Sequence, residues 1–289
     1  MTELSLGILL VLGTLAGAIN AAVGSGSLLT LPVLMALGVP PGTAVRTNTL
    51  GIMFSTIGSV SGYRKEILAE RSQLGPLSVV ALVGASTGSI LLLLAPGGAL
   101  DIVVPILIIV ALILVVFQKQ ISALIARAGS PARDRSSGRR TGVSGQAAAG
   151  AAGTPGAVGA DDPAAVGPYR SGPLVASMGL ASVYGGFFTA AQGVLYMGLL
   201  GAFTRRPLGE VNPVKNWLSL IVNGVAVAVY LFAHVVWSAP ILWIASGAIA
   251  VGALLGGYFG AHLAKRLPDA VLRGVIVVVA LVALVRQFV

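Results

Sequence analysis

The sequence contains no cysteine and only two histidines, His234 and His262. The absence of cysteine excludes disulfide bonds, thiolate nucleophiles and cysteine-based metal sites. Two histidines far apart in the chain also argue against a histidine metal cluster, so we expect no metal ion and no cofactor. Charged residues are scarce as well: they make up 9% of the chain, against about 25% in a typical soluble domain.

Hydrophobic residues, in contrast, make up 56% of the 289 residues, and many form runs of about 20 residues. Such runs predict an all-α polytopic membrane protein embedded in a lipid bilayer. The first run begins almost at Met1 without a basic region before it, so we expect no cleaved signal peptide. Ten apolar segments can be read: 4–23, 28–37, 44–62, 74–95 and 100–117 in one half, and 173–191, 194–202, 214–233, 240–264 and 271–288 in the other.

A polar stretch separates the two halves and divides the chain into a first membrane repeat (1–118), a linker (119–170) and a second membrane repeat (171–289). The linker is rich in Ala, Gly, Ser and Pro and has few bulky apolar residues, which predicts a disordered tether. The alternative is that its arginines bind anionic lipid; the candidates are Arg133, Arg135, Arg139 and Arg140.

The net charge of +9 raises the possibility of a nucleic-acid partner. However, the basic residues lie in short groups at the ends of apolar runs, without interleaved aromatics, so we expect no nucleic-acid binding. The positive-inside rule instead places these groups and the linker in the cytoplasm, and the protein in the inner (plasma) membrane with both termini outside. All of these groups can lie in the cytoplasm only if each of the two short segments reverses the direction of the chain through the membrane. The two halves are then inverted repeats. The groups are Arg64, Lys65 and Arg71; Arg205 and Arg206; and Lys265, Arg266 and Arg273.

Each half contains one broken helix. In the first, the break Gly24-Ser25-Gly26-Ser27 precedes the short segment 28–37, and Arg46-Thr47-Asn48 opens the next run. In the second, Gly185-Gly186 and Ala190-Ala191-Gln192-Gly193 form the break before 194–202, and Asn212-Pro213-Val214-Lys215-Asn216 opens the next run. Interrupted helices at corresponding positions of two halves indicate the binding site of a secondary transporter.

The chemistry of these breaks suits a small anionic substrate. A helix N-terminus presents free N–H groups and a positive dipole end, and hydroxyl and amide side chains add donors. The alternatives are tight helix packing for the small residues and snorkelling for the two cations. The candidate substrate-binding residues are Gly24, Ser25, Gly26, Ser27, Arg46, Thr47, Asn48, Thr189, Ala191, Gln192, Gly193, Lys215 and Asn216.

Acidic residues are missing from the middle of the apolar runs; Asp101 and Glu210 lie at expected helix starts. A cation carrier or a carboxylate proton relay would need one within the membrane, so the absence favours an anion. Any proton would then travel on the substrate or through a histidine. No catalytic constellation can be read, so we do not expect an enzyme, and no oligomeric state follows from the sequence.

These motifs resemble the TauE/SafE family of sulfite exporters and related permeases. The resemblance rests on the first break, the turn Pro40-Pro41-Gly42-Thr43-Ala44, and the second-half motifs 185–193, 212–216 and 222–224. Two departures are Ser25 within the first glycine run and Thr189 where glycine is commoner. The resemblance implies export of sulfite or an organosulfonate by alternating access; the alternative is an importer or channel for another anion, such as sulfate or a carboxylate.

Overall fold

In the computed structural model, residues 3–117, 120 and 168–263 are described. Over these ranges the chain forms α-helices and one 3-10 turn and no β-strand, which confirms the predicted all-α membrane fold. The first half contains α1 (Glu3–Ala22), α2 (Ser27–Ala36), α3 (Pro41–Gly62), α4 (Arg64–Glu70), η1 (Arg71–Gln73), α5 (Gly75–Leu94) and α6 (Gly97–Val116). The second contains α8 (Gly172–Phe188), α9 (Gln192–Thr204), α10 (Leu208–Trp237) and α11 (Trp243–Leu263).

Nine of the ten expected segments correspond to helices, and the tenth, 271–288, lies outside the described residues, as does most of the linker. Helix α10 is longer than expected, with 30 residues, because its polar first turns continue the helix from Leu208. The short helix α4 was not expected. Five described helices are long and apolar enough to cross a membrane: α1, α5, α6, α10 and the described part of α11.

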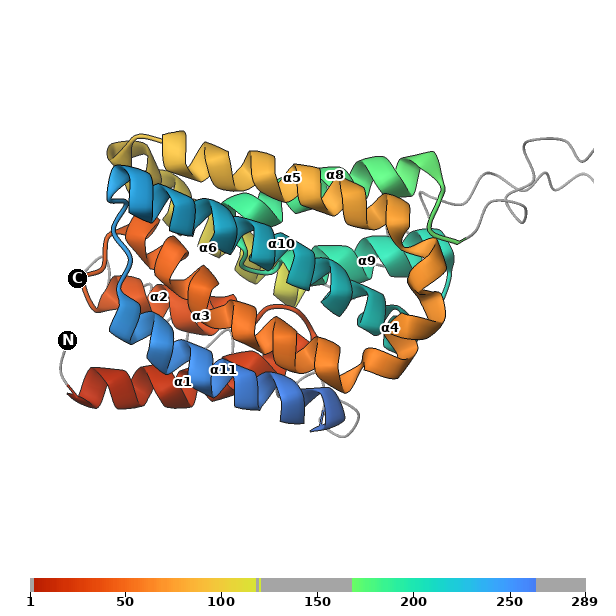
Figure 1. Cartoon of the computed structure of the whole chain (residues 1–289), viewed down its shortest axis with the longest axis horizontal. Coiled ribbons are helices and arrows are strands. Elements are labelled where there is room, and N and C mark those ends of the chain that lie inside the picture. Colours follow the sequence, from red (N-terminus) through yellow and green to blue (C-terminus); the bar gives the residue numbers. More distant parts are fainter. Residues whose placement is uncertain (1–2, 118–119, 121–167, 264–289) are drawn as a thin grey trace, which may run out of the picture.

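The two halves exchange helices. The first helix of each half packs against the helix of the fourth apolar segment of the other half: α1 against α11, and α8 against α5 (Figure 1). Helices α3 and α10 lie between these pairs and contact each other. Small residues permit the close approach, since a Cβ atom on Gly17 would lie 2.4 Å from the Ala253 oxygen, and one on Gly186 would lie 2.3 Å from the Ala85 oxygen.

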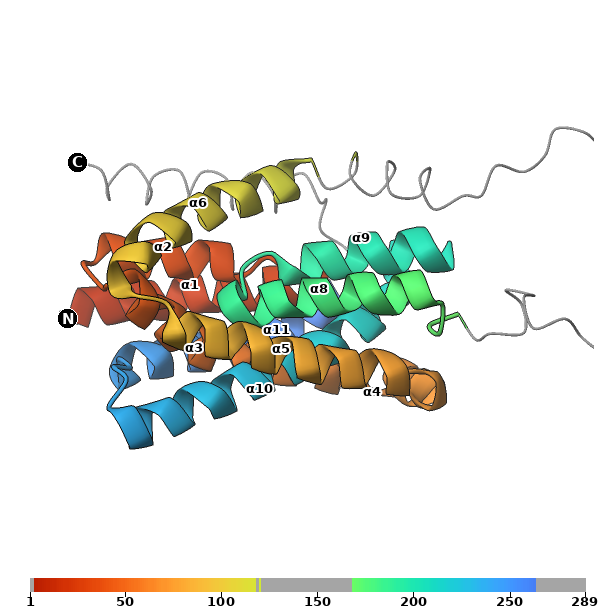
Figure 2. The ribbon, with the colours of Figure 1, turned by 90° about the horizontal axis from the view of Figure 1, so that it is seen from above.

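The helices of the two halves run in opposite senses. Figure 1 shows α1 beginning at the end of the bundle marked N, whereas α8 begins at the opposite end. In Figure 2 the connections from α1 to α2 and from α8 to α9 both lie toward the middle of the long axis. The short helices α2 and α9 therefore both begin near the middle of the bundle.

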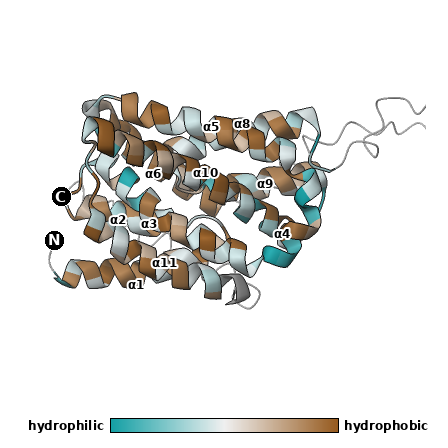
Figure 3. Ribbon diagram, in the orientation of Figure 1, coloured by the Kyte–Doolittle hydropathy of each residue, from teal (hydrophilic) through white to brown (hydrophobic). Residues whose placement is uncertain are grey.

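Apolar side chains cover the outside of the long helices, as expected of a surface that faces lipid. Val79, Leu94, Val235 and Ile244 are among the large hydrophobic residues that are more than half exposed. Polar residues, in contrast, gather at one end of the bundle, around α4 (Figure 3). This end carries the basic groups Arg64, Lys65, Arg71, Arg205 and Arg206.

One ionic cluster joins the halves at this end. Arg206, in the loop before α10, forms an ion pair with Glu70 at the end of α4 (2.8 Å) and donates to the hydroxyl of Tyr169, which also donates to Glu70. Burial by itself would raise the pKa of Glu70, but the hydrogen bonds from Arg206 and Tyr169 and the charge of Arg206 lower it. The cluster thus holds Glu70 in its charged form.

Candidate functional site: the junction of the two broken helices

The first break is a buried turn between α1 and α2. Its N–H group at Gly24 bonds to the carbonyl oxygen of Ile19 (3.2 Å), which closes the last turn of α1. The backbone of Gly24 is left-handed (φ +85°), a conformation that glycine adopts without strain. Gly24, Ser25, Gly26 and Ser27 are all buried, and Ser27 is the first residue of α2. The predicted position of this break is confirmed.

The second break is shorter than predicted and covers Thr189 to Ala191. Thr189 and Ala191 both have left-handed backbones (φ 54° and 59°), which is unusual for residues with a Cβ atom. Gly185 and Gly186 do not belong to the break, because both lie inside α8. The space beside Gly186 is filled by the backbone of α5, so this glycine serves helix packing, the alternative reading of small residues.

The two breaks touch each other directly. The N–H of Gly193 donates to the carbonyl oxygen of Gly24 (3.2 Å). A Cβ atom on Gly24 would lie 2.4 Å from the Cα of Gly193, so neither position has room for a side chain. The hydroxyls of Thr49 on α3 and Thr189 also face each other at 3.4 Å. The structure therefore brings together the starts of α2 and α9, residues that lie far apart in the sequence.

Buried polar atoms without partners gather around this junction. Ser25 is fully buried and Gln192 is 3% exposed, and Ser25 Oγ and Gln192 Oε1 have no hydrogen-bond partner among the described residues. A buried polar group costs free energy when it is unpaired, so such atoms are rare in a folded protein. Asn48 Nδ2 and Asn216 Oδ1 are buried and unpaired as well. These four residues are all members of the predicted site.

Lys215 lies against the end of α1, just before the first break. Its side chain is fully buried, and its ammonium donates to the carbonyl oxygens of Asn20 (2.8 Å) and Ala21 (3.3 Å). Asn216 Nδ2 also donates to the Ala21 oxygen, at 3.2 Å. Lys215 therefore satisfies the negative C-terminal end of a helix, where a cation is stabilised. An ammonium has three donors, so one remains for a ligand.

The remaining candidates on α3 have different surroundings. Asn48 accepts a hydrogen bond from Thr30 on α2, which fixes its side chain beside the short helix. Thr47 faces α11: its hydroxyl accepts from the N–H of Leu242, and its carbonyl accepts from the hydroxyl of Ser246. Thr47 therefore holds α3 to the start of α11, and in the described part of the chain no hydrogen bond joins it to either break.

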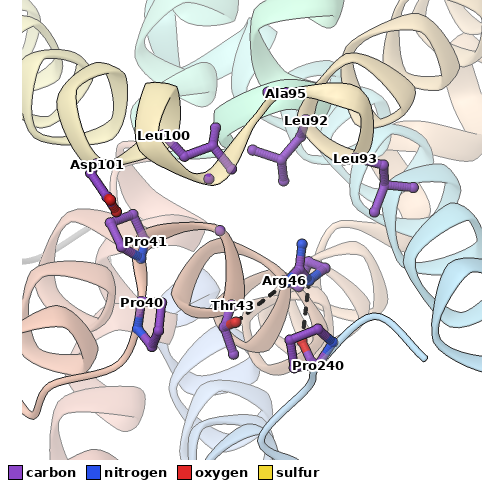
Figure 4. Close-up of a pocket in the computed structure, with 12 residues that line it drawn as sticks. Pro40, Pro41, Thr43, Arg46, Leu92, Leu93, Ala95, Leu100, Asp101 and Pro240 are labelled. Atoms are coloured by element: carbon purple, nitrogen blue, oxygen red, sulfur yellow. Dashed lines mark hydrogen bonds between the residues drawn. The ribbon is translucent and has the colours of Figure 1, made fainter. Parts of the chain in front are cut away.

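Arg46 faces a separate cavity at the end of the bundle opposite α4 (Figure 4). Its guanidinium donates to the Pro240 oxygen (3.1 Å) and to the Thr43 hydroxyl (3.3 Å). Among the described residues, no hydrogen bond joins Arg46 to either break. Arg46 and Lys215 occupy corresponding positions in the two halves, but they have different partners.

Several residues that hold this junction were not identified from the sequence. Asn212 donates to the Ala21 oxygen (3.2 Å) and to the Tyr63 hydroxyl (3.0 Å), and the four-residue spacing to Asn216 was the available signal. Tyr184 and Tyr230 donate to the Ala190 and Gly186 oxygens at the end of α8. Nothing in the sequence distinguishes these two tyrosines from ordinary buried aromatics.

Carboxylates do not line the junction in the described part of the chain. Glu3, Glu66, Asp101 and Glu210 are exposed, and Glu70 belongs to the ionic cluster near α4. In the same residues, no group of His, Cys, Asp or Glu could hold a metal ion. The junction thus offers hydroxyl, amide, ammonium and helix N-terminal donors without a competing negative side chain, a set suited to an anion.

Comparison with known proteins agrees with the resemblance to the TauE/SafE family noted in the sequence. A family model described as Sulfite exporter TauE/SafE matches residues 9–286. The chain is 31% identical over 109 residues to the probable membrane transporter protein YfcA of Escherichia coli (strain K12), covering 38% of this chain and 40% of that protein.

It is also 28% identical over 104 residues to the probable membrane transporter protein ORF9 of Sinorhizobium sp, covering 36% of this chain and 40% of that protein. The matched parts thus span about two fifths of the length of these curated relatives. No solved structure matches. The family match extends over nearly the whole sequence and through both broken helices, so this chain is a multi-pass membrane protein that belongs to the TauE/SafE sulfite exporter family.

Proposed function

We propose that this transporter exports a small sulfur oxyanion, sulfite or an organosulfonate, by alternating access, and that it binds the anion at the junction of the two breaks. One observation carries the proposal: Ser25 and Gln192 are buried at this junction, and Ser25 Oγ and Gln192 Oε1 have no hydrogen-bond partner among the described residues. An anion would accept hydrogen bonds from the Ser25 hydroxyl and from the NH2 group of Gln192, and it would lie near the N-terminal ends of α2 and α9, where negative charge is stabilised.

Three kinds of donor would hold the anion. Ser25 supplies a hydroxyl, and the amide of Gln192 can turn its NH2 group toward the ligand. Lys215 supplies a third N–H and a positive charge while its other two bonds stay on α1. The contact between Gly24 and Gly193 brings the two helix starts close enough to act on one ligand.

In this proposal the halves are inverted repeats, and the linker lies in the cytoplasm as a tether between membrane domains 1–118 and 171–289. The opposite senses of α1 and α8 and the shared end of the basic groups support this arrangement. The tether is tested by replacing residues 130–166 with a Gly/Ser chain of equal length, which should leave transport unchanged. Normal membrane insertion with lost transport would give the linker a further role.

The site is tested by sulfite flux in proteoliposomes with Gln192→Ala. A hydrogen bond to a charged ligand is worth roughly 1.5–3 kcal/mol, so affinity should fall about tenfold to a hundredfold. Gln120→Ala, at an exposed position, is the matched control and should transport like the parent. A panel of sulfite, sulfate, an organosulfonate and a carboxylate in the same assay identifies the preferred anion and its direction.

Two outcomes would contradict the proposal in different ways. If Gln192→Ala and Lys215→Ala fold and transport sulfite like the parent, the anion binds elsewhere. If the parent, correctly folded in the same liposomes, moves no oxyanion, the transport reading itself fails. Preference for sulfate or a carboxylate would instead establish the alternative substrate class.

A further inference from the structure

A second cavity lies beside Arg46, away from the junction of the breaks. The Arg46 pocket is a cavity of about 370 Å³ between the start of α3, the end of α5, the start of α6 and the loop before α11. Figure 4 shows the Arg46 guanidinium on one wall, with Leu92, Leu93 and Leu100 across from it. The volume leaves room for a small oxyanion together with several water molecules.

The charge of Arg46 has no counterion in the described part of the chain. The residue is only 9% exposed, and its two hydrogen bonds, from Nε to Pro240 and from Nη2 to Thr43, go to uncharged oxygens. The Nη1 group donates to no described residue. A buried guanidinium without a negative partner is costly, whereas an oxyanion can accept several of its N–H groups at once.

Two helix starts face the same cavity. The first free N–H groups of α3 belong to Gly42 and Thr43, since Pro40 and Pro41 have none, and the first of α6 belongs to Gly97. A Cβ atom on Gly42 would lie 3.6 Å from Arg46 Nη1 and 2.8 Å from Leu100, so glycine keeps the guanidinium accessible. The pocket thus combines a buried cation with two helix N-termini, both of which favour an anion.

We infer that the Arg46 pocket binds a water-soluble oxyanion as a second site, distinct from the junction, at the end of the transporter away from α4. The inference rests on the proposed function because it takes the bound anion to be the transported substrate. Thr49, three residues beyond Arg46 on α3, contacts Thr189 in the second break, so α3 connects the two sites. In the proposed orientation this pocket is where exported anion leaves and where external anion first binds.

Asp101 provides an internal check on the charge preference. Its exposed carboxylate lies at the edge of the pocket beside Pro41 and forms no ion pair with Arg46. Its negative charge should weaken anion binding through unfavourable electrostatic interaction. Asp101→Asn should therefore tighten binding severalfold, and because the side chain is exposed, this variant should fold normally.

The test uses a fluorophore on Gly98→Cys, which is possible because the chain has no native cysteine. Gly98 is exposed, and a Cβ atom there meets nothing within 4 Å. Purified full-length protein is titrated with sulfite and with sulfate. We expect a saturable fluorescence change whose Kd rises at least tenfold with Arg46→Gln and stays unchanged with the matched control Arg64→Gln, an exposed arginine on α4.

Further variants separate this inference from the proposed function. Gln192→Ala should leave the fluorescence titration unchanged, because it alters the junction alone. If Arg46→Gln is unstable, two other variants still test the second site. Arg46→Lys should weaken anion binding and raise the Kd, whereas Asp101→Asn should tighten binding and lower it. A parent that transports sulfite without a fluorescence response overturns only the second site. A response with the expected variant effects but without transport overturns only the proposed function.

The phosphate of a lipid headgroup could bind the same cationic pocket. Titrations in detergent and in lipid nanodiscs distinguish it from a water-soluble oxyanion. The response should persist in nanodiscs that contain an anionic phospholipid. A response in detergent that disappears in those nanodiscs would assign the pocket to a lipid headgroup and overturn the inference. Equal Kd values for Arg46→Gln and Arg64→Gln would overturn it as well.

Discussion

The ammonium of Lys215 on α10 lies 2.8 Å from the carbonyl oxygen of Asn20 on α1, and this contact joins two residues 195 positions apart. It places a positive charge on the C-terminal end of a helix that stops inside the bundle, where water cannot satisfy the last carbonyl groups. The second half of the chain therefore supports the broken helix of the first half.

The first prediction concerns this support. Lys215→Met should lower the thermal stability of the purified protein even without anion, because it removes two charge-assisted hydrogen bonds, each worth roughly 1.5–3 kcal/mol. Lys65→Met, at an exposed lysine on α4, is the control and should change little. Unchanged stability combined with reduced sulfite flux would show that Lys215 serves only the ligand.

The second prediction concerns Thr189, the β-branched residue with a left-handed backbone (φ 54°). Thr189→Gly should raise the melting temperature by a few degrees, because a left-handed residue with a Cβ atom costs roughly 1–2 kcal/mol that glycine avoids. Thr189→Ala keeps the Cβ atom and should show no such gain. The ordering would be contradicted if Thr189→Ala proved the more stable of the two in thermal unfolding.

The third prediction concerns pH. The pKa of Glu70 is lowered in the folded state, so its contribution to stability is fully present above the ordinary value of 4.5 and is lost as the pH falls through the lowered value. Glu70→Gln should destabilise the protein near neutral pH and flatten the acid limb of the melting temperature against pH. Glu66→Gln, on the exposed side of α4, should retain the parent's acid limb.

The fourth prediction concerns orientation in the membrane. Single cysteines replacing Ser72 and Ser136 should react with a membrane-impermeant reagent only from the cytoplasm, and one replacing Ser238 only from outside. Labelling of the loop 205–207 from outside would contradict the inverted repeats. Reaction of the same positions in detergent confirms that each cysteine is accessible.

The helices could be predicted closely because length and hydropathy decide them. Segment 28–37 differs from α2 by one residue at each end, and the first break lies where the glycines indicated. Helix α4 was missed because its seven residues include four charged ones and offer no apolar run. Gly185 and Gly186 were assigned to a break because glycine suits both breaks and close packing, and only the position of α5 decides between them.

The sequence could indicate which residues lie where the breaks meet, but it could not indicate which groups the side chains of the candidate site contact. Ser25 and Gln192 were expected at the meeting of the breaks, and the contact between Gly24 and Gly193 brings those breaks together. The separate surroundings of Arg46 and Lys215 could not be predicted from their matching places in the two halves. Which carbonyl or cavity a long cationic side chain faces depends on helices that are distant in the sequence.

The exchange of helices between the halves also has a consequence for biosynthesis. Helix α11 begins about 220 residues after α1 ends. At ribosomal rates of about 5–20 residues per second, α1 waits roughly ten to forty seconds for its main partner. During that interval the glycine face of α1 meets lipid or another membrane component, and the end of α1 lacks its lysine. The nascent first half cannot complete its own packing, so α1 reaches its final position only after α10 and α11 have been synthesised.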